Sequence, residues 1–248
     1  MNRRTLMIGT IAVALVTGRG HARSTAVTVG ERVAALENEI ARRRRTGTAI
    51  SGNWLALQLE QGLTTRERRI AAFRIIQNIP YKLTPWKGDP DSLLTLGQGD
   101  CRHKSAALLS VLRALKVEAS PVKVPFDWAD LPIPPNVLGH LLETRGIHDA
   151  VEARIDGKVV LVDPTWDPAL KSVGFPVLSD WDGVGATLPI TPNANIVVRA
   201  GELKAGTDLF AHFGIAWPQR QRTQAFNRAL NAWTDEVRAG ASAVSVKG

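Results

Sequence analysis

Apolar residues recur at helical spacing in the first third of the chain, as at Val33, Leu36 and Ile40. Thr65 is a typical helix-capping residue, and Pro80 ends the last of these periodic stretches because proline has no N–H to donate. The pattern predicts three successive helices: Glu31–Arg45, Ser51–Gly62, and Thr65 to about Asn78.

The pattern then changes twice around residue 101. Tyr81–Asp100 is rich in Pro, Gly and Asp, which predicts a long loop. Arg102–Lys116 has apolar residues at nearly every helical position, and a helix of this kind is buried inside its domain. The loop is therefore expected to deliver Cys101 to the start of a central helix.

The second half of the chain shows strand patterns. Asp156-Gly157 between two β-rich runs is a strong signal for a tight hairpin. The Pro-rich stretch Pro125–Pro135 is expected to be a surface loop. The predicted strands are Glu118–Val124, Ile147–Ile155, Lys158–Val162 and Ile196–Arg199, and a last helix is predicted over Gln221–Arg238.

The two-residue turn fixes the register of the hairpin. Ile155 then pairs with Lys158, so that Ala150 lies opposite Asp163. Because side chains alternate along a strand, His148 and Asp163 share one face as diagonal neighbours, roughly 7–8 Å apart at the backbone. An imidazole-to-carboxylate hydrogen bond can span that distance. The opposite face, which carries Val151 and Val162, is expected to face the core.

Composition indicates a globular chain with an export signal. It has 248 residues, 44% of them hydrophobic, enough for a sizeable core. Residues 1–22 combine Arg3 and Arg4, a short apolar run and small residues before Ala22, which predicts a signal peptide for the general or the twin-arginine route. The predicted division is a signal peptide over 1–22, a helical extension over 23–64, a catalytic domain over 65–200 and a helical segment over 201–248.

Charge and metal-ligand patterns exclude some classes of function. The net charge is +8, and three of the arginines lie within residues 1–22, which leaves a net charge of +5 for the rest. These charges are spread along the chain, so we expect no nucleic-acid partner. The apolar run within residues 1–22 is too short for an ordinary membrane-spanning helix, so we expect no integral membrane segment in the exported protein. No metal-ligand spacing occurs, so neither a metal nor another cofactor is expected.

Cys101 is the single cysteine, so it cannot form an intramolecular disulfide. A helix N-terminus favours the thiolate form of a cysteine, and the glycines Gly97 and Gly99 allow backbone N–H groups to approach a substrate carbonyl. With His148 as base and Asp163 holding the imidazole, these groups predict a nucleophilic triad.

Three sequence segments together resemble the transglutaminase-like superfamily. They are the Gly99-Asp100-Cys101 segment with its helix, Ile147-His148-Asp149-Ala150, and Leu161-Val162-Asp163-Pro164. The resemblance implies a papain-like α+β fold in which the cysteine helix packs on an antiparallel sheet. It also implies that Cys101 is the nucleophile, His148 the base and then the acid, and Asp163 the orienting carboxylate.

The expected activity is hydrolysis of an amide in a protein or peptide, with the cell envelope as one source of substrates, in an exported and periplasmic location. Gln98, Trp86 and Trp166 are candidates for oxyanion or substrate contacts. Transfer of the acyl group to an amine stays open as an alternative, and so does a non-catalytic envelope-binding protein of the same fold. The sequence does not predict an oligomeric state.

Overall fold

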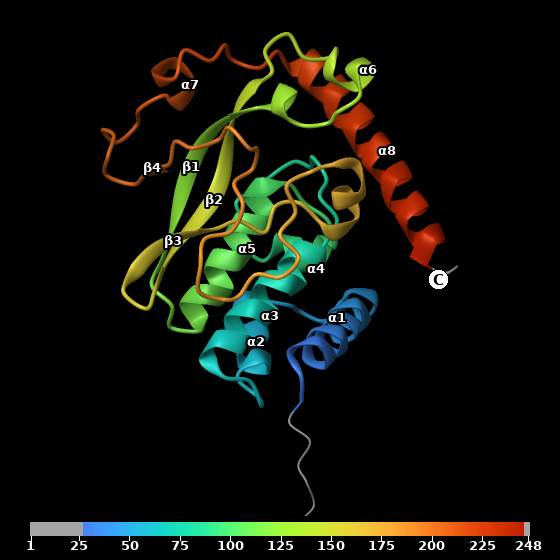
Figure 1. The fold of residues 1–248 in the computed structure, drawn as a ribbon, viewed down its shortest axis with the longest axis vertical. Helices are drawn as coiled ribbons and strands as arrows, with labels where there is room; N and C mark the ends of the chain where they lie inside the picture. The colour runs from blue at the N-terminus through green and yellow to red at the C-terminus, as the bar shows by residue number, and fades with distance from the viewer. Residues whose placement is uncertain (1–26, 246–248) are drawn as a thin grey trace, which may run out of the picture.

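The computed structural model describes residues 27–245, so the predicted signal peptide over 1–22 lies outside the described residues. Figure 1 shows a mixed fold in which helices precede and follow an antiparallel sheet. The helices are α1 (Val29–Thr46), α2 (Gly52–Leu59), α3 (Thr65–Asn78), α4 (Ser92–Leu96), α5 (Cys101–Ala114), α6 (Pro135–Leu138), α7 (Leu209–His212) and α8 (Arg220–Ser245). The strands are β1 (Ala119–Asp127), β2 (Arg145–Ile155), β3 (Lys158–Val162) and β4 (Val198–Arg199).

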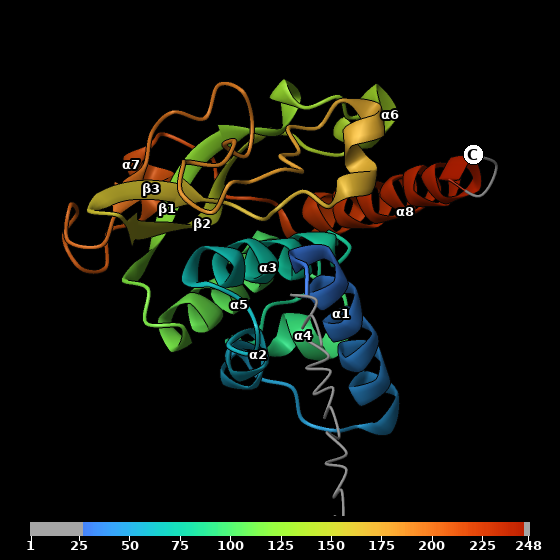
Figure 2. The ribbon, with the colours of Figure 1, turned by 60° about the horizontal axis from the view of Figure 1, so that its bottom comes forward.

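The sheet has the strand order β3-β2-β1-β4, with every neighbouring pair antiparallel. Ile155 pairs with Lys158 and Val151 with Val162, which confirms the predicted register of the hairpin. Figure 2 shows α3 and α5 side by side beneath the sheet, and α1, α2 and α4 form a further layer below them. The cysteine-bearing helix therefore lies in the middle of the molecule, as its apolar sequence predicts.

Two hydrophobic clusters cover the two faces of the sheet. The first joins the helical layers to Val151, Ala153 and Val162, which is the face predicted to pack inward. The second contains Val122, Ala150 and residues from the C-terminal half of the chain, including Phe226 of α8. Both faces are thus buried, and the C-terminal segment forms part of the same core.

Two sequence predictions about loops are wrong in part. The predicted surface loop over Pro125–Pro135 begins too early, because β1 continues to Asp127. Prolines at 121 and 125 are tolerated there since β4 pairs only with Val122 and Lys123, which leaves most of that edge of β1 without a partner strand. The long loop Tyr81–Asp100 contains the short helix α4, which Leu93 and Leu94 anchor by burying their side chains.

Among residues 27–245, no helix is both long enough and apolar enough to cross a membrane.

Candidate active site

The start of α5 holds Cys101 in the first helical position. Asp100 caps this helix: its carboxylate accepts hydrogen bonds from the backbone N–H groups of Arg102 and His103, at 3.1 and 3.4 Å. The first N–H groups of a helix have no carbonyl partner within the helix. Asp100 takes two of them, and within residues 27–245 the N–H of Cys101 makes no backbone hydrogen bond to a neighbouring loop.

Gly99 brings the preceding loop against the helix. A Cβ atom at this position would lie 2.5 Å from the Cβ of His103 and 2.9 Å from Leu93, closer than side-chain atoms can approach. Its backbone N–H donates to Pro80 at 3.2 Å, and its carbonyl accepts from Lys82 at 2.9 Å. Glycine is therefore required for the loop to run directly beside the helix start.

His148 and Asp163 meet as the hairpin register predicts. His148 Nε2 and Asp163 Oδ2 are 2.7 Å apart, and both side chains are buried. Asp163 is held in turn, because its backbone N–H donates to the Thr187 hydroxyl at 2.8 Å and its Oδ1 accepts from the backbone N–H of Thr165 at 3.1 Å. The carboxylate is thus fixed from two sides while it orients the imidazole.

The other ring nitrogen of His148 is Nδ1, which is not used in the contact with Asp163. Nδ1 is buried and has no hydrogen-bond partner among the residues that the structure describes. Burial lowers the pKa of His148, but the charge of Asp163, its hydrogen bond and the adjacent Cys101 together raise it to about 10. At neutral pH the imidazole of His148 is therefore protonated.

Cys101 and His148 open into one hollow of about 390 Å³, called the Cys101 hollow below. Cys101 itself is half-buried. The hollow is bordered by the start of α5, by the facing ends of β1 and β2, and by residues of α7 and α8. Segments far apart in the sequence therefore form a single site.

Tyr81 lines the hollow and was not singled out by sequence reasoning. Its ring is buried and lies 4.5 Å from the ring of Trp166, centroid to centroid. Burial raises the pKa of Tyr81 well above its ordinary value, and the neighbouring Cys101 and Asp100 raise it further, so the phenol keeps its proton. The sequence signal was weak, since a tyrosine at the start of a polar loop has many ordinary roles.

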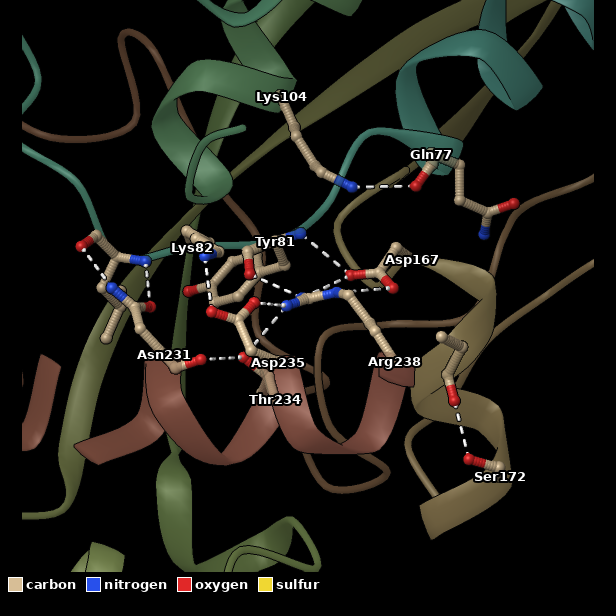
Figure 3. Close-up of polar contacts among 12 residues, drawn as sticks. Gln77, Tyr81, Lys82, Lys104, Asp167, Ser172, Asn231, Thr234, Asp235 and Arg238 are labelled. Carbon is tan, nitrogen blue, oxygen red and sulfur yellow. Dashed lines mark hydrogen bonds and ion pairs between the residues drawn. The ribbon is translucent and has the colours of Figure 1, made fainter. Parts of the chain in front are cut away.

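The backbone of Tyr81 is clamped between the end of the hairpin and α8 (Figure 3). Its N–H donates to Asp167 Oδ2 at 2.9 Å, and its carbonyl accepts from Arg238 at 2.7 Å. Arg238 also forms an ion pair with Asp167 at 2.8 Å. This arrangement, the Tyr81–Asp167–Arg238 clamp, ties the last helix to the residue beside Cys101.

The three other predicted site residues lie around the hollow without lining it. Trp86 contacts the ring of His103 edge-on at 4.9 Å, and Gln98 lies in the turn before the helix cap. Trp166 is buried in the second cluster, where its indole N–H donates to the carbonyl of Ile190 at 2.8 Å. Their roles toward an oxyanion or a substrate stay predictions.

The part of the chain between residues 27 and 245 contains no group of three or more His, Cys, Asp or Glu side chains that could hold a metal ion.

Comparison with known proteins finds a family model that is similar to part of the chain. Residues 55–164 match the model of the "Transglutaminase-like superfamily", and this stretch includes Cys101, His148 and Asp163. None of the curated proteins compared with the chain matches it. A solved structure titled "Putative Cysteine Protease from Cytophaga hutchinsonii" is 15% identical with a TM-score of 0.33; the aligned region covers 54% of this chain and 37% of that one.

Proposed function

We propose that this chain, whose residues 55–164 match the model of the transglutaminase-like superfamily, is a cysteine-dependent amide hydrolase that works through Cys101, His148 and Asp163. The observation that carries the proposal is the buried 2.7 Å contact between His148 Nε2 and Asp163, next to a thiol at a helix start. The contact leaves Nδ1 of the same ring to serve the thiol. A nucleophile, a base and an orienting group in this order are what covalent catalysis requires.

The proposed reaction begins with attack of the Cys101 thiolate on the carbonyl carbon of an amide. The oxyanion that forms would accept hydrogen bonds from the backbone N–H of Cys101 and from the Tyr81 phenol, which borders the same hollow. The tetrahedral intermediate collapses when the C–N bond breaks and His148 Nδ1 gives its proton to the departing amine. A thioester then remains on Cys101.

Hydrolysis completes the cycle in this proposal. A water molecule loses a proton to the now neutral His148 and attacks the thioester, which releases a carboxylic acid and restores the thiolate and the imidazolium. The half-exposed Cys101 and the charged side chains at the hollow allow water to enter, which favours water as the acyl acceptor over an amine. Export to the periplasm, predicted from residues 1–22, would place the substrate in the cell envelope.

Alkylation by iodoacetamide tests the nucleophile without knowledge of the substrate. We expect the wild-type thiol to react at pH 6 to 7 many times faster than a free cysteine, because the His148 imidazolium favours its thiolate. In His148→Ala this advantage should disappear. His212→Ala is the matched control, since His212 is exposed and lies on α7. Equal reactivity of wild type and His148→Ala at pH 6 would contradict the proposal and favour a non-catalytic binding protein.

A second measurement separates hydrolysis from acyl transfer. The protein would be incubated with casein and a labelled primary amine, and both cleavage and label incorporation would be followed by mass spectrometry. Cleavage or deamidation dependent on Cys101 is expected. Incorporation of the amine without either would replace the hydrolase with a transamidase.

A further inference from the structure

We propose that the Cys101 hollow selects amides that carry a large apolar side chain, aromatic above all, next to the reacting carbonyl. This inference rests on the proposed function, because it names the substrate class of the same site. It is carried by three features: a row of aromatic rings that begins at His148, a wall supplied by the C-terminal segment, and the pairing of every charge that lines the hollow.

The aromatic row leads away from the reacting groups. The ring of Phe126 lies 6.1 Å from that of His148, and the ring of Trp128 lies 5.0 Å from Phe126. Phe226 of α8 continues the row, 5.1 Å from Trp128. Phe126 and Trp128 are only half-buried although they border the hollow. Their exposed surface is therefore available to a substrate ring, which prefers such edge-to-face contacts.

The opposite wall comes from residues outside the matched family region of 55–164. Leu209 and Phe210 of α7 and Pro218 line the hollow, and the two α7 side chains are half-buried. The segment between β4 and α8 runs along the end of the sheet where β1 ends and β2 begins (Figure 1). This wall is thus a feature of this chain's C-terminal segment, added to the shared core.

Polar contacts hold this segment in place. Arg145 at the start of β2 donates to the carbonyl of Gly214 at 2.9 Å, and the ring of Trp217 stacks on Phe210 at 4.5 Å. The indole N–H of Trp217 donates to Asp208, which caps α7, at 3.0 Å. Phe210 is therefore positioned by its neighbours and not by insertion into the core, so it can be replaced without emptying a buried site.

Each charged side chain that lines the hollow has an oppositely charged partner among the described residues. Arg102 bonds Asp100 at 2.6 Å, Arg145 bonds Glu143 at 2.7 Å, and Lys123 bonds Asp149. His148 is paired with Asp163. A charged substrate would have to compete with these existing pairs, so apolar contact is the main source of selectivity.

Three alkylating reagents with the same reactive group test the proposal: iodoacetamide, N-benzyl iodoacetamide and N-carboxymethyl iodoacetamide. Each rate at Cys101 is divided by the rate of the same reagent with glutathione. We expect the benzyl reagent to gain about tenfold over iodoacetamide in the wild type, because an apolar pocket discriminates on that order per added group. The carboxymethyl reagent should show no gain.

Two variants locate the effect. Phe210→Ala should reduce the gain of the benzyl reagent over iodoacetamide several-fold. Phe213→Ala is the matched control, because it lies in the same segment without lining the hollow, and it should keep the gain. The inference would be overturned if the wild type reacted no faster with the benzyl reagent than with iodoacetamide, or gained equally with the carboxymethyl reagent. It would also be overturned if Phe210→Ala kept the full gain of the benzyl reagent. Failure of the proposed function would appear separately, as an iodoacetamide rate that His148→Ala leaves unchanged.

Discussion

His148 and Asp163 show how two buried groups set each other's state. A fully buried imidazole alone would lose its proton, since burial disfavours the charged form. The carboxylate 2.7 Å away reverses this and raises the pKa of His148 to about 10. The protonated ring is therefore a property of the pair, and the charge of Asp163 is needed as well as its shape.

Replacement of Asp163 by asparagine separates charge from shape. Asp163→Asn keeps an oxygen that can accept from His148 Nε2 but removes the negative charge. The pKa of His148 should fall, and alkylation of Cys101 near pH 7 should slow by about tenfold, because a neutral ring no longer favours the thiolate. Rates of iodoacetamide labelling across pH measure this.

Asp149→Asn provides the control for that change. Asp149 is adjacent to His148 in sequence, but its carboxylate pairs with Lys123. Labelling should keep its wild-type pH profile in this variant. Equal effects of the two substitutions would show that general electrostatics, and not the His148–Asp163 contact, governs the thiol.

Among the elements, α8 has a role that its late position in the chain does not suggest. Its Arg238 reaches both Asp167 and the carbonyl of Tyr81 with a side chain that is 15% exposed. The helix also contributes Phe226 to the hollow and to the second cluster. A surface helix thereby takes part in shaping the site.

Removal of the Arg238 guanidinium should therefore be costly. In Arg238→Met the carboxylate of Asp167 stays buried without its partner, and the free energy of unfolding should fall by about 3 kcal/mol. Urea denaturation followed by circular dichroism measures this change. Arg228→Met, on an exposed position of the same helix, should stay within about 0.5 kcal/mol of wild type. Similar losses in both variants would contradict a specific role for the clamp.

In the molecule as a whole, a buried lysine links the central helix to the hairpin. Lys104 is fully buried, and its Nζ donates to the carbonyls of Gln77 and Pro164, at 2.9 and 3.4 Å. Burial lowers the pKa of Lys104 to about 7, although Asp167 opposes the shift. The group therefore titrates near neutral pH in the folded state and near pH 10.4 when unfolded.

This difference makes stability depend on pH. Between about pH 7 and 10.4 the unfolded chain binds a proton at Lys104 that the folded chain does not, so this group makes the folded state more stable as pH rises. His148 has the opposite sign, because its raised pKa gives stability below about pH 6.5 that is lost as pH rises through 10. Lys104→Met should remove only the first contribution.

Unfolding in urea at pH 7 and at pH 10 isolates the lysine. The difference in unfolding free energy between wild type and Lys104→Met should move in favour of wild type at the higher pH, with the His148 contribution common to both proteins. Lys158→Met, at an exposed position of β3, should show no such movement. A difference that is the same at both pH values would show that Lys104 is charged in the folded state throughout.

Local rules were sufficient for much of the fold. The helices α1, α3 and α5 follow from apolar spacing and capping residues. The alternation of side chains along the strands and the two-residue turn were enough to fix the register of the hairpin, and with it the contact between His148 and Asp163. Local rules failed where the packing of other elements determines the structure. Two prolines are accommodated in β1 because its neighbour β4 is short, and α4 forms because the core buries Leu93 and Leu94.

By itself, the sequence determined the central helix, the hairpin and the three residues proposed for catalysis, because each depends on residues close together in the chain or on one turn. Only the tertiary structure revealed Tyr81 beside Cys101, the buried Lys104, and the wall that Phe210 adds to the hollow. The contact between Arg238 and Tyr81 joins residues 157 positions apart. Such pairings arise from how layers pack, and no local spacing encodes them.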